Sequence, residues 1–316
     1  MKYFVGIDIG GTNSKIGILD EKGNLLVSTS TKTESIKGVD YSLTKIWNTV
    51  LEMAKENGVN SEDIKGIGMG IPGPVINQEI VGFFANFPWE RNINISKKME
   101  EISKVKTKLD NDVNVIALGE TVFGAGKGFS KSVTIALGTG IGGGIFIDGK
   151  LISGASGVGG EIGHMKLEKD GKLCGCGQKG CFETYASATG IIREATSRLM
   201  VNKNNSLYTA IDGDLNKLEA KHIFDEAKKG DKFSLDIVDY VSEYLAMGIG
   251  NVLNILNPEV IILAGGVALA GDILLDSVKE KLKKYTLDNA LTGLEIKIGE
   301  LGNNAGIMGA AVLSKN

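Results

Sequence analysis

Two stretches decide the fold: residues 5–27 read VGIDIGGTNSKIGILDEKGNLLV, and residues 133–152 read VTIALGTGIGGGIFIDGKLI. In each, an apolar strand pattern enters a glycine-rich turn, a second strand follows, and a polar turn leads into a third strand. The order strand, turn, strand, turn, strand predicts an antiparallel meander. Because the pattern occurs twice, we interpret it as one duplicated supersecondary unit, with one copy in each of two lobes.

Helix and strand patterns alternate through the rest of the chain. Residues 43–54 carry apolar side chains at i, i+3, i+4 and i+7, which predicts an amphipathic helix. Residues 64–70 predict a buried strand, the apolar stripe over 237–253 predicts a long helix, and residues 260–263 predict another strand. Alternation of this kind favours an α/β protein.

The composition excludes several classes of protein. The 316 residues include 35 Lys+Arg and 38 Asp+Glu, for a formal charge of −3. This balance leaves no electrostatic footprint for nucleic acid or an anionic membrane. No apolar run approaches the ~20 residues that a membrane span needs, and Asp8 interrupts the run that a signal peptide would continue. We therefore expect a cytoplasmic protein that binds neither nucleic acid nor membrane.

The two glycine-rich turns are candidate phosphate sites. Residues 138–143 satisfy G-x-G-x-x-G, but a dinucleotide-binding fold requires a helix after this turn, and here a strand pattern follows. No G-x-x-x-x-G-K-[S/T] motif occurs, so a P-loop is excluded. The turns at 10–13 and 138–140 expose backbone N–H groups that suit phosphate oxygens, and Asp8 is a candidate Mg²⁺ ligand. The alternative is two tight structural turns.

All three cysteines lie close together and follow a histidine. A tetrahedral Cys₃His zinc site accounts for this spacing, with His164, Cys174, Cys176 and Cys181 as ligands. Such a site leaves no open coordination position, so the predicted zinc is structural rather than catalytic. An odd, clustered set of cysteines is a poor disulfide framework. The alternative is three free thiols beside a surface histidine.

The segment from Glu161 to Glu183 resembles the ROK family (repressors, open-reading-frame proteins and sugar kinases), whose pattern includes E-x-G-H and C-x-C-G-x-x-G-C-x-E. The two glycine turns and Ala264-Gly265-Gly266 resemble the phosphate and adenosine motifs of the wider actin-like ATPase superfamily. The resemblance extends from Asp8 to a predicted helix at 304–309.

This resemblance implies a two-lobed α/β fold of the actin-like ATPase (ribonuclease H-like) type, with a mixed sheet and flanking helices in each lobe and a cleft between the lobes. The small lobe would comprise residues 1–116 and 298–316, and the large lobe residues 117–297.

The resemblance also implies roles for individual residues. Asp112 matches the general base. The sugar would be bound by Gly73, Asn86, Asn111, Asp112, Glu161, His164 and Glu183. ATP and Mg²⁺ would be bound by Asp8, Gly10, Gly11, Thr12, Asn13, Lys15, Gly138, Thr139, Gly140, Gly265 and Gly266. His164 would place one ring nitrogen on zinc and the other on a sugar hydroxyl. The alternatives are that Asp112 is an ordinary helix N-cap and that Glu161 and Glu183 are solvated surface acids.

The activity that follows is an ATP-dependent hexose kinase that converts glucose to glucose 6-phosphate, with ATP, Mg²⁺ and structural Zn²⁺ as cofactors. N-acetylmannosamine, mannose and fructose are alternative substrates. A sugar-sensing ROK regulator is an alternative of another class, although the first glycine turn follows Met1 too closely to leave room for a helix-turn-helix. An Hsp70-like or actin-like ATPase is a third, which the Cys₃His element disfavours. The family also implies a homodimer or tetramer.

Overall fold

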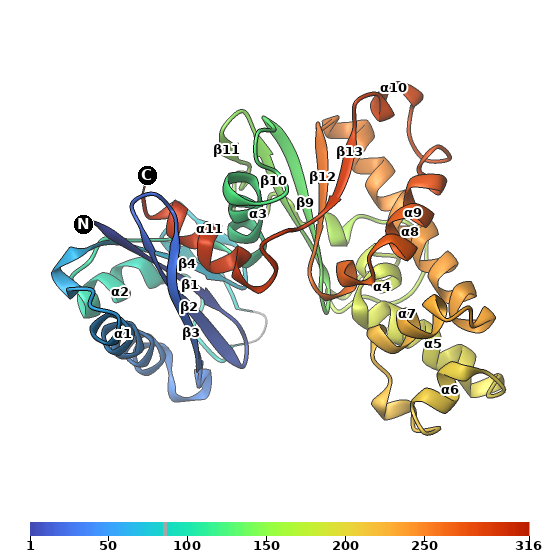
Figure 1. The fold of residues 1–316 in the computed structure, drawn as a ribbon, viewed down its shortest axis with the longest axis horizontal. Coiled ribbons are helices and arrows are strands. Elements are labelled where there is room, and N and C mark those ends of the chain that lie inside the picture. Colours follow the sequence, from blue (N-terminus) through green and yellow to red (C-terminus); the bar gives the residue numbers. More distant parts are fainter. Residues whose placement is uncertain (85–86, 316) are drawn as a thin grey trace. The chain divides into compact units, whose positions relative to one another are not determined.

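The computed structural model describes residues 1–84 and 87–315 (Figure 1). The chain forms two compact units. The first unit comprises residues 1–134, 144–160 and 300–316, and the second comprises residues 135–143 and 161–299. The lobe boundaries given above, and the cleft, remain predictions. Asn86, a predicted sugar ligand, lies outside the described residues.

The first unit is built on a five-stranded sheet with strand order β3-β2-β1-β4-β8. The strands β1 (Tyr3–Ile9), β2 (Asn13–Asp20) and β3 (Leu25–Lys32) form an antiparallel meander. The strands β4 (Ile64–Ile71) and β8 (Thr107–Asn111) continue the sheet in parallel with β1. The predicted meander and the predicted strand at 64–70 are therefore confirmed.

Four helices of the first unit are α1 (Val39–Glu56), α2 (Ile95–Ser103), α3 (Asp112–Phe123) and α11 (Ala305–Leu313). The predicted helix at 43–54 lies inside α1, and the one at 304–309 corresponds to α11. The shorter elements are the strands β5 (Val75–Ile76), β6 (Ile80–Val81) and β7 (Ile93–Asn94), and the 3₁₀ helices Ser35–Lys37, Ser61–Asp63 and Gly302–Asn304.

The C-terminal helix α11 packs directly on the backbone of the first sheet. A Cβ atom at Gly68 of β4 would overlap the carbonyl of Ala310, and one at Gly6 of β1 would overlap the carbonyl of Ile307. Close approach of two backbones is a common reason for glycine inside a strand. These glycines therefore allow the end of the chain to lie against the strands that carry its beginning.

The second sheet has the strand order β11-β10-β9-β12-β13. Its strands are β9 (Lys131–Leu137), β10 (Ile141–Ile147), β11 (Lys150–Leu151), β12 (Val260–Ala264) and β13 (Glu295–Ile298). The second copy of the motif is thus strand, glycine turn, strand, turn and short strand, as predicted. Because a strand follows the turn at 138–140, the exclusion of a dinucleotide-binding fold holds.

Helices make up most of the second unit. The longest is α8 (Lys232–Leu256), which contains the predicted stripe at 237–253. The others are α4 (Glu183–Ala186), α5 (Ala188–Val201), α6 (Ser206–Ala210), α7 (Ala220–Lys228), α9 (Asp272–Leu282) and α10 (Asp288–Leu291), with 3₁₀ helices at Ile162–His164, Leu215–Lys217 and Gly266–Ala270.

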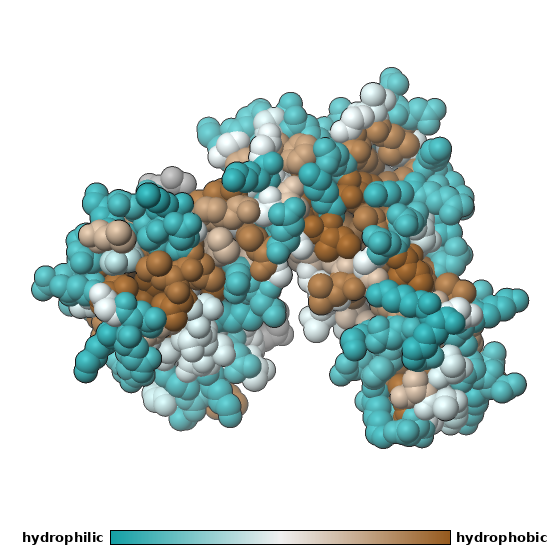
Figure 2. All heavy atoms as spheres, in the orientation of Figure 1, coloured by the Kyte–Doolittle hydropathy of each residue, from teal (hydrophilic) through white to brown (hydrophobic). Residues whose placement is uncertain are grey.

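On the face shown in Figure 2, hydrophilic residues cover most of the outer surface of each unit. Among the described residues, no helix combines the length and the apolar character needed to cross a bilayer.

Candidate active site and metal cluster

In the first unit, predicted site residues gather at the carboxyl ends of three parallel strands. Asp8 of β1 pairs with Gly70 of β4, and Ile71 of β4 pairs with Asn111 of β8. Gly73 follows two residues after β4 ends. This edge is where open α/β sheets usually bind ligands, because the loops that leave the strands converge there.

Asn111 and Asp112 form the start of α3. The Asn111 Oδ1 accepts hydrogen bonds from the backbone N–H of Val113 at 2.9 Å and of Asn114 at 3.4 Å, so Asn111 is the N-cap and Asp112 is the first helical residue. The alternative that Asp112 is merely the N-cap is therefore wrong. The Asn111 Nδ2 donates to the Gly73 carbonyl at 3.2 Å, which joins two predicted sugar ligands.

Two carboxylates of this unit interact electrostatically. Burial, together with the negative charge of Asp112, raises the pKa of Asp8 from 3.8 to about 6, while Lys15 acts in the opposite direction. Burial also raises the pKa of Asp112, although hydrogen bonds from the Val113 backbone and the Asn111 side chain oppose it. Neighbouring acids with raised pKa values can hold a divalent cation or accept a proton near neutral pH.

The first glycine turn is held by a residue that the sequence analysis missed. The Gly10 N–H donates to the Asn13 carbonyl at 3.1 Å, which closes the turn. The fully buried Thr33 donates its hydroxyl to the Gly10 carbonyl at 2.7 Å, and its N–H donates to the Thr12 carbonyl at 2.9 Å. Thr33 follows directly after β3, so only the pairing of β2 with β3 brings it to the turn. Gly11, Thr12 and Asn13 remain exposed.

The second glycine turn lies in the second unit, beside the predicted adenosine motif. Its Gly138 N–H donates to the Gly140 carbonyl at 3.0 Å. Gly265 has φ +87° and lies so close to β9 that a Cβ atom would be 2.6 Å from the Leu137 carbonyl oxygen. The turn and the motif at 265–266 therefore meet at the end of one strand.

The four predicted zinc ligands come together in the second unit. One ligand atom from each of His164, Cys174, Cys176 and Cys181 lies within 4.8 Å of the others. The Cys176 Sγ is 3.7 Å from the Cys181 Sγ, and the Cys174 Sγ is 3.8 Å from the His164 Nδ1. Ligand atoms about 2.3 Å from zinc at tetrahedral angles lie about 3.8 Å apart. The donor set and its spacing thus fit Zn²⁺.

Glu183 connects this cluster to the second glycine turn. Its Oε1 lies 3.0 Å from the Cys174 Sγ and 3.8 Å from the His164 Nδ1, and its Oε2 accepts a hydrogen bond from the Ile141 N–H at 3.4 Å. The side chain is only 22% exposed, so Glu183 is not a solvated surface acid. Glu161, whose side chain is 45% exposed, places its Oε2 3.9 Å from the His164 Nε2. The two ring nitrogens therefore face different partners, as the predicted double use of His164 requires.

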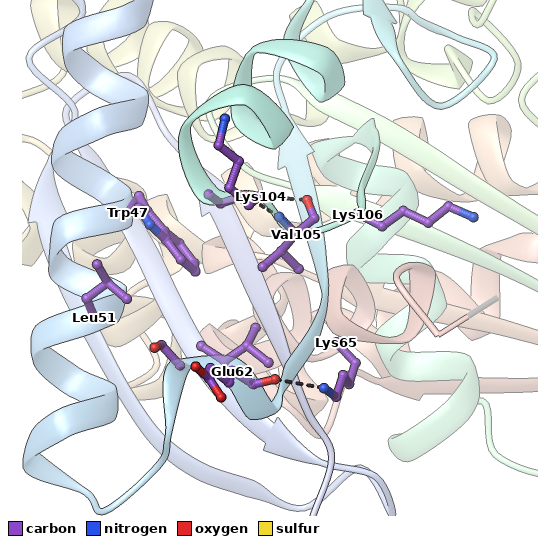
Figure 3. Close-up of a pocket in the computed structure, with 10 residues that line it drawn as sticks. Trp47, Leu51, Glu62, Lys65, Lys104, Val105 and Lys106 are labelled. Carbon is purple, nitrogen blue, oxygen red and sulfur yellow. Dashed lines mark hydrogen bonds between the residues drawn. The ribbon is translucent and has the colours of Figure 1, made fainter.

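A separate cavity of about 560 Å³ lies in the first unit, between α1 and the amino ends of β4 and β8 (Figure 3). Trp47 and Leu51 of α1 form one wall, and Lys65 and Val105 lie across from them. The cavity is lined by none of the predicted site residues and lies at the opposite end of the parallel strands from Asp8 and Asn111. We assign it no role.

The chain belongs to the ROK family, because the model of that family matches residues 4–316. A glucokinase of Halalkalibacterium halodurans is 38% identical over 317 aligned residues, which cover 99% of this chain and 95% of that protein. A ROK family glucokinase of Streptomyces griseus, solved in complex with glucose and AMPPNP, is 32% identical with a TM-score of 0.85 and 99% coverage of both chains.

A ROK family transcriptional regulator is also similar in structure. It is 25% identical with a TM-score of 0.88, and the match covers 98% of this chain and 77% of that chain. The predicted family and the predicted fold class, the actin-like ATPase fold, are confirmed. Since kinases and a regulator share this fold, the fold alone does not separate the two activities.

Proposed function

We propose that this protein is an ATP-dependent hexose kinase that phosphorylates the 6-hydroxyl of glucose. The observation that carries the proposal is the carboxylate pair Asp8 and Asp112, which lies at the ligand-binding edge of the sheet in the same unit as the exposed glycine turn at 10–13. The full-length similarity to glucokinases supports glucose as the substrate. N-acetylmannosamine, mannose and fructose remain candidate substrates.

Asp112 is proposed as the general base. It accepts the proton of the 6-hydroxyl while that oxygen bonds to the γ-phosphorus of ATP, and the bond from the γ-phosphorus to the bridging oxygen breaks to release ADP. Burial raises the pKa of Asp112, which makes its carboxylate a stronger base than an exposed one. Asn111 and Gly73, joined by a hydrogen bond, would bind sugar hydroxyls beside it.

The remaining predicted ligands fall into two groups. In the first unit, Gly10, Gly11, Thr12, Asn13 and Lys15 would bind the phosphates of ATP. In the second, Gly138, Thr139 and Gly140 would bind phosphate, Gly265 and Gly266 would bind adenosine, and Glu161, His164 and Glu183 would bind the sugar. Charge neutralisation and positioning by such groups supply most of the catalysis in phosphoryl transfer.

Both metal ions are part of the proposal. Asp8 fits Mg²⁺, since a partly buried carboxylate next to a second acid favours a divalent cation, and bound Mg²⁺ would neutralise phosphate charge. His164, Cys174, Cys176 and Cys181 fit structural Zn²⁺, which would fix the segment that carries Glu183. We also propose a cytoplasmic homodimer or tetramer, which size-exclusion chromatography with light scattering tests.

A coupled ADP-release assay tests the activity. The purified full chain is supplied with Mg-ATP and, in turn, glucose, mannose, fructose and N-acetylmannosamine. We expect kcat/KM to be highest with glucose and ADP to form in equal amount with glucose 6-phosphate. Phosphorylation of none of these sugars, with hexose binding retained in calorimetry, would overturn the kinase proposal and favour the regulator. A preference for N-acetylmannosamine would overturn glucose as the substrate and leave the kinase activity standing.

A further inference from the structure

A lysine lies against the proposed metal cluster. Lys166 and Cys181 face each other across an isolated antiparallel β-bridge. The Lys166 Nζ lies 2.8 Å from the Cys181 Sγ and also donates to the His164 carbonyl at 3.2 Å. Its ammonium group therefore contacts one proposed ligand directly and the main chain of another.

The charge of the cluster explains what this contact does. Three thiolates and a neutral imidazole around Zn²⁺ carry a net charge of −1. Cys181 is fully buried and Cys174 is 4% exposed, whereas Cys176 is exposed, so water reaches the thiolates of Cys174 and Cys181 poorly. A buried charge is costly unless an opposite charge accompanies it. The Glu183 carboxylate beside Cys174 adds further negative charge, and the ammonium of Lys166 offsets part of it at Cys181.

We propose that Lys166 is a positioning residue for zinc, which stabilises the metal-bound thiolate of Cys181 by its charge and its hydrogen bonds. The proposal rests on the zinc site proposed above and goes beyond it, because Lys166 belongs to neither the predicted ligands nor the predicted sugar contacts. It follows that the affinity of the four ligands for zinc depends on a residue that never contacts the metal.

The expected loss of zinc affinity can be judged from other side chains that hydrogen-bond to metal ligands. Loss of such a partner typically lowers metal affinity about 10–100-fold. Lys166→Met keeps the length of the stem but removes the charge and both hydrogen bonds, so we expect a loss in this range. Lys166→Arg keeps the charge and the donors, so its affinity should stay within about threefold of the wild type.

Zinc affinity is measured on the full chain by competition with a chromogenic zinc chelator at fixed pH. The matched control is Lys169→Met, because Lys169 is an exposed lysine three residues further along the same segment. The control removes the same net charge from the protein and should leave zinc affinity unchanged. A second readout is the rise in melting temperature that zinc adds to the metal-free protein, which should shrink for Lys166→Met only.

The outcomes separate the two proposals. A wild type that binds no zinc overturns the zinc site and the role of Lys166 together. A wild type that binds zinc, with Lys166→Met as tight as Lys169→Met, overturns the role of Lys166 and leaves the zinc site standing. Metal-free Lys166→Met could melt at a lower temperature than the metal-free wild type while zinc raises the melting temperature of both by the same amount. That result would assign Lys166 to folding alone and would also overturn the proposal.

Discussion

Removal of the Asp8 charge should make the protein more stable while it abolishes activity. Burial and Asp112 raise the pKa of Asp8 from 3.8 to about 6, so the folded state binds this proton more tightly than the unfolded state does. Stability is therefore lost as the pH rises through this window. A pKa difference of one unit between the folded and unfolded states corresponds to about 1.4 kcal/mol. The ionised Asp8 carboxylate therefore lowers the free energy of unfolding by up to about 3 kcal/mol at pH 7.5 and by about half of that at pH 5.

The assay is chemical denaturation of wild type and Asp8→Asn in magnesium-free buffer with zinc retained. We expect Asp8→Asn to gain free energy of unfolding at pH 7.5 and to gain less at pH 5. The control is Asp20→Asn, at the far end of the same strand pair. Hydrogen bonds from Asn24 lower the pKa of Asp20, so this variant should gain no stability. A gain for Asp8→Asn that does not change with pH, or no gain at all, would refute the electrostatic argument.

Four further changes have distinct expected results. Asp112→Asn should lower kcat about 10²–10⁴-fold with hexose binding retained in calorimetry; near-normal turnover would remove Asp112 from the role of base. Cys176→Ser, or zinc removal, should raise the KM for hexose at temperatures where circular dichroism still shows a folded protein; an unchanged KM in metal-free protein contradicts this. Thr33→Val should raise the KM for ATP but not for hexose, because the Gly10 carbonyl loses its hydroxyl donor; equal changes in both count against it. Gly68→Val should lower stability by at least about 1–3 kcal/mol in thermal unfolding, because the new side chain meets α11; a wild-type melting temperature would show that α11 does not pack there.

The sequence predicts the repeated local structure well. Apolar alternation and the glycine turns predict both meanders, and helical spacing predicts the helices at 43–54 and 237–253. These features depend on neighbours in the chain, so periodicity and turn chemistry specify them. The grouping of the three cysteines was likewise predictable, because short loops connect Cys174, Cys176 and Cys181, and His164 precedes them by ten residues.

Contacts between distant segments were not predictable in this way. Thr33 reaches the first turn only through the register of β2 with β3, and α11 packs on β1 across almost the full length of the chain. Lys166 contacts Cys181 across an isolated bridge of a single residue pair, which carries no periodic pattern. Which residue caps α3 also escaped the sequence, because Asn111 and Asp112 are both strong N-cap types and only the local backbone decides between them.

The glycines of the second turn lack a side chain for different structural reasons. Nothing lies within 4 Å of a Cβ atom built on Gly138, so its open backbone is consistent with a phosphate-binding N–H. At Gly140 the same atom would be 2.6 Å from the Glu183 Oε2, so the absence of a side chain there makes room for the carboxylate. The same carboxylate contacts the Cys174 Sγ through its other oxygen. The Glu183 side chain therefore links the metal cluster to the proposed phosphate turn, so we expect loss of zinc to weaken nucleotide binding as well as sugar binding.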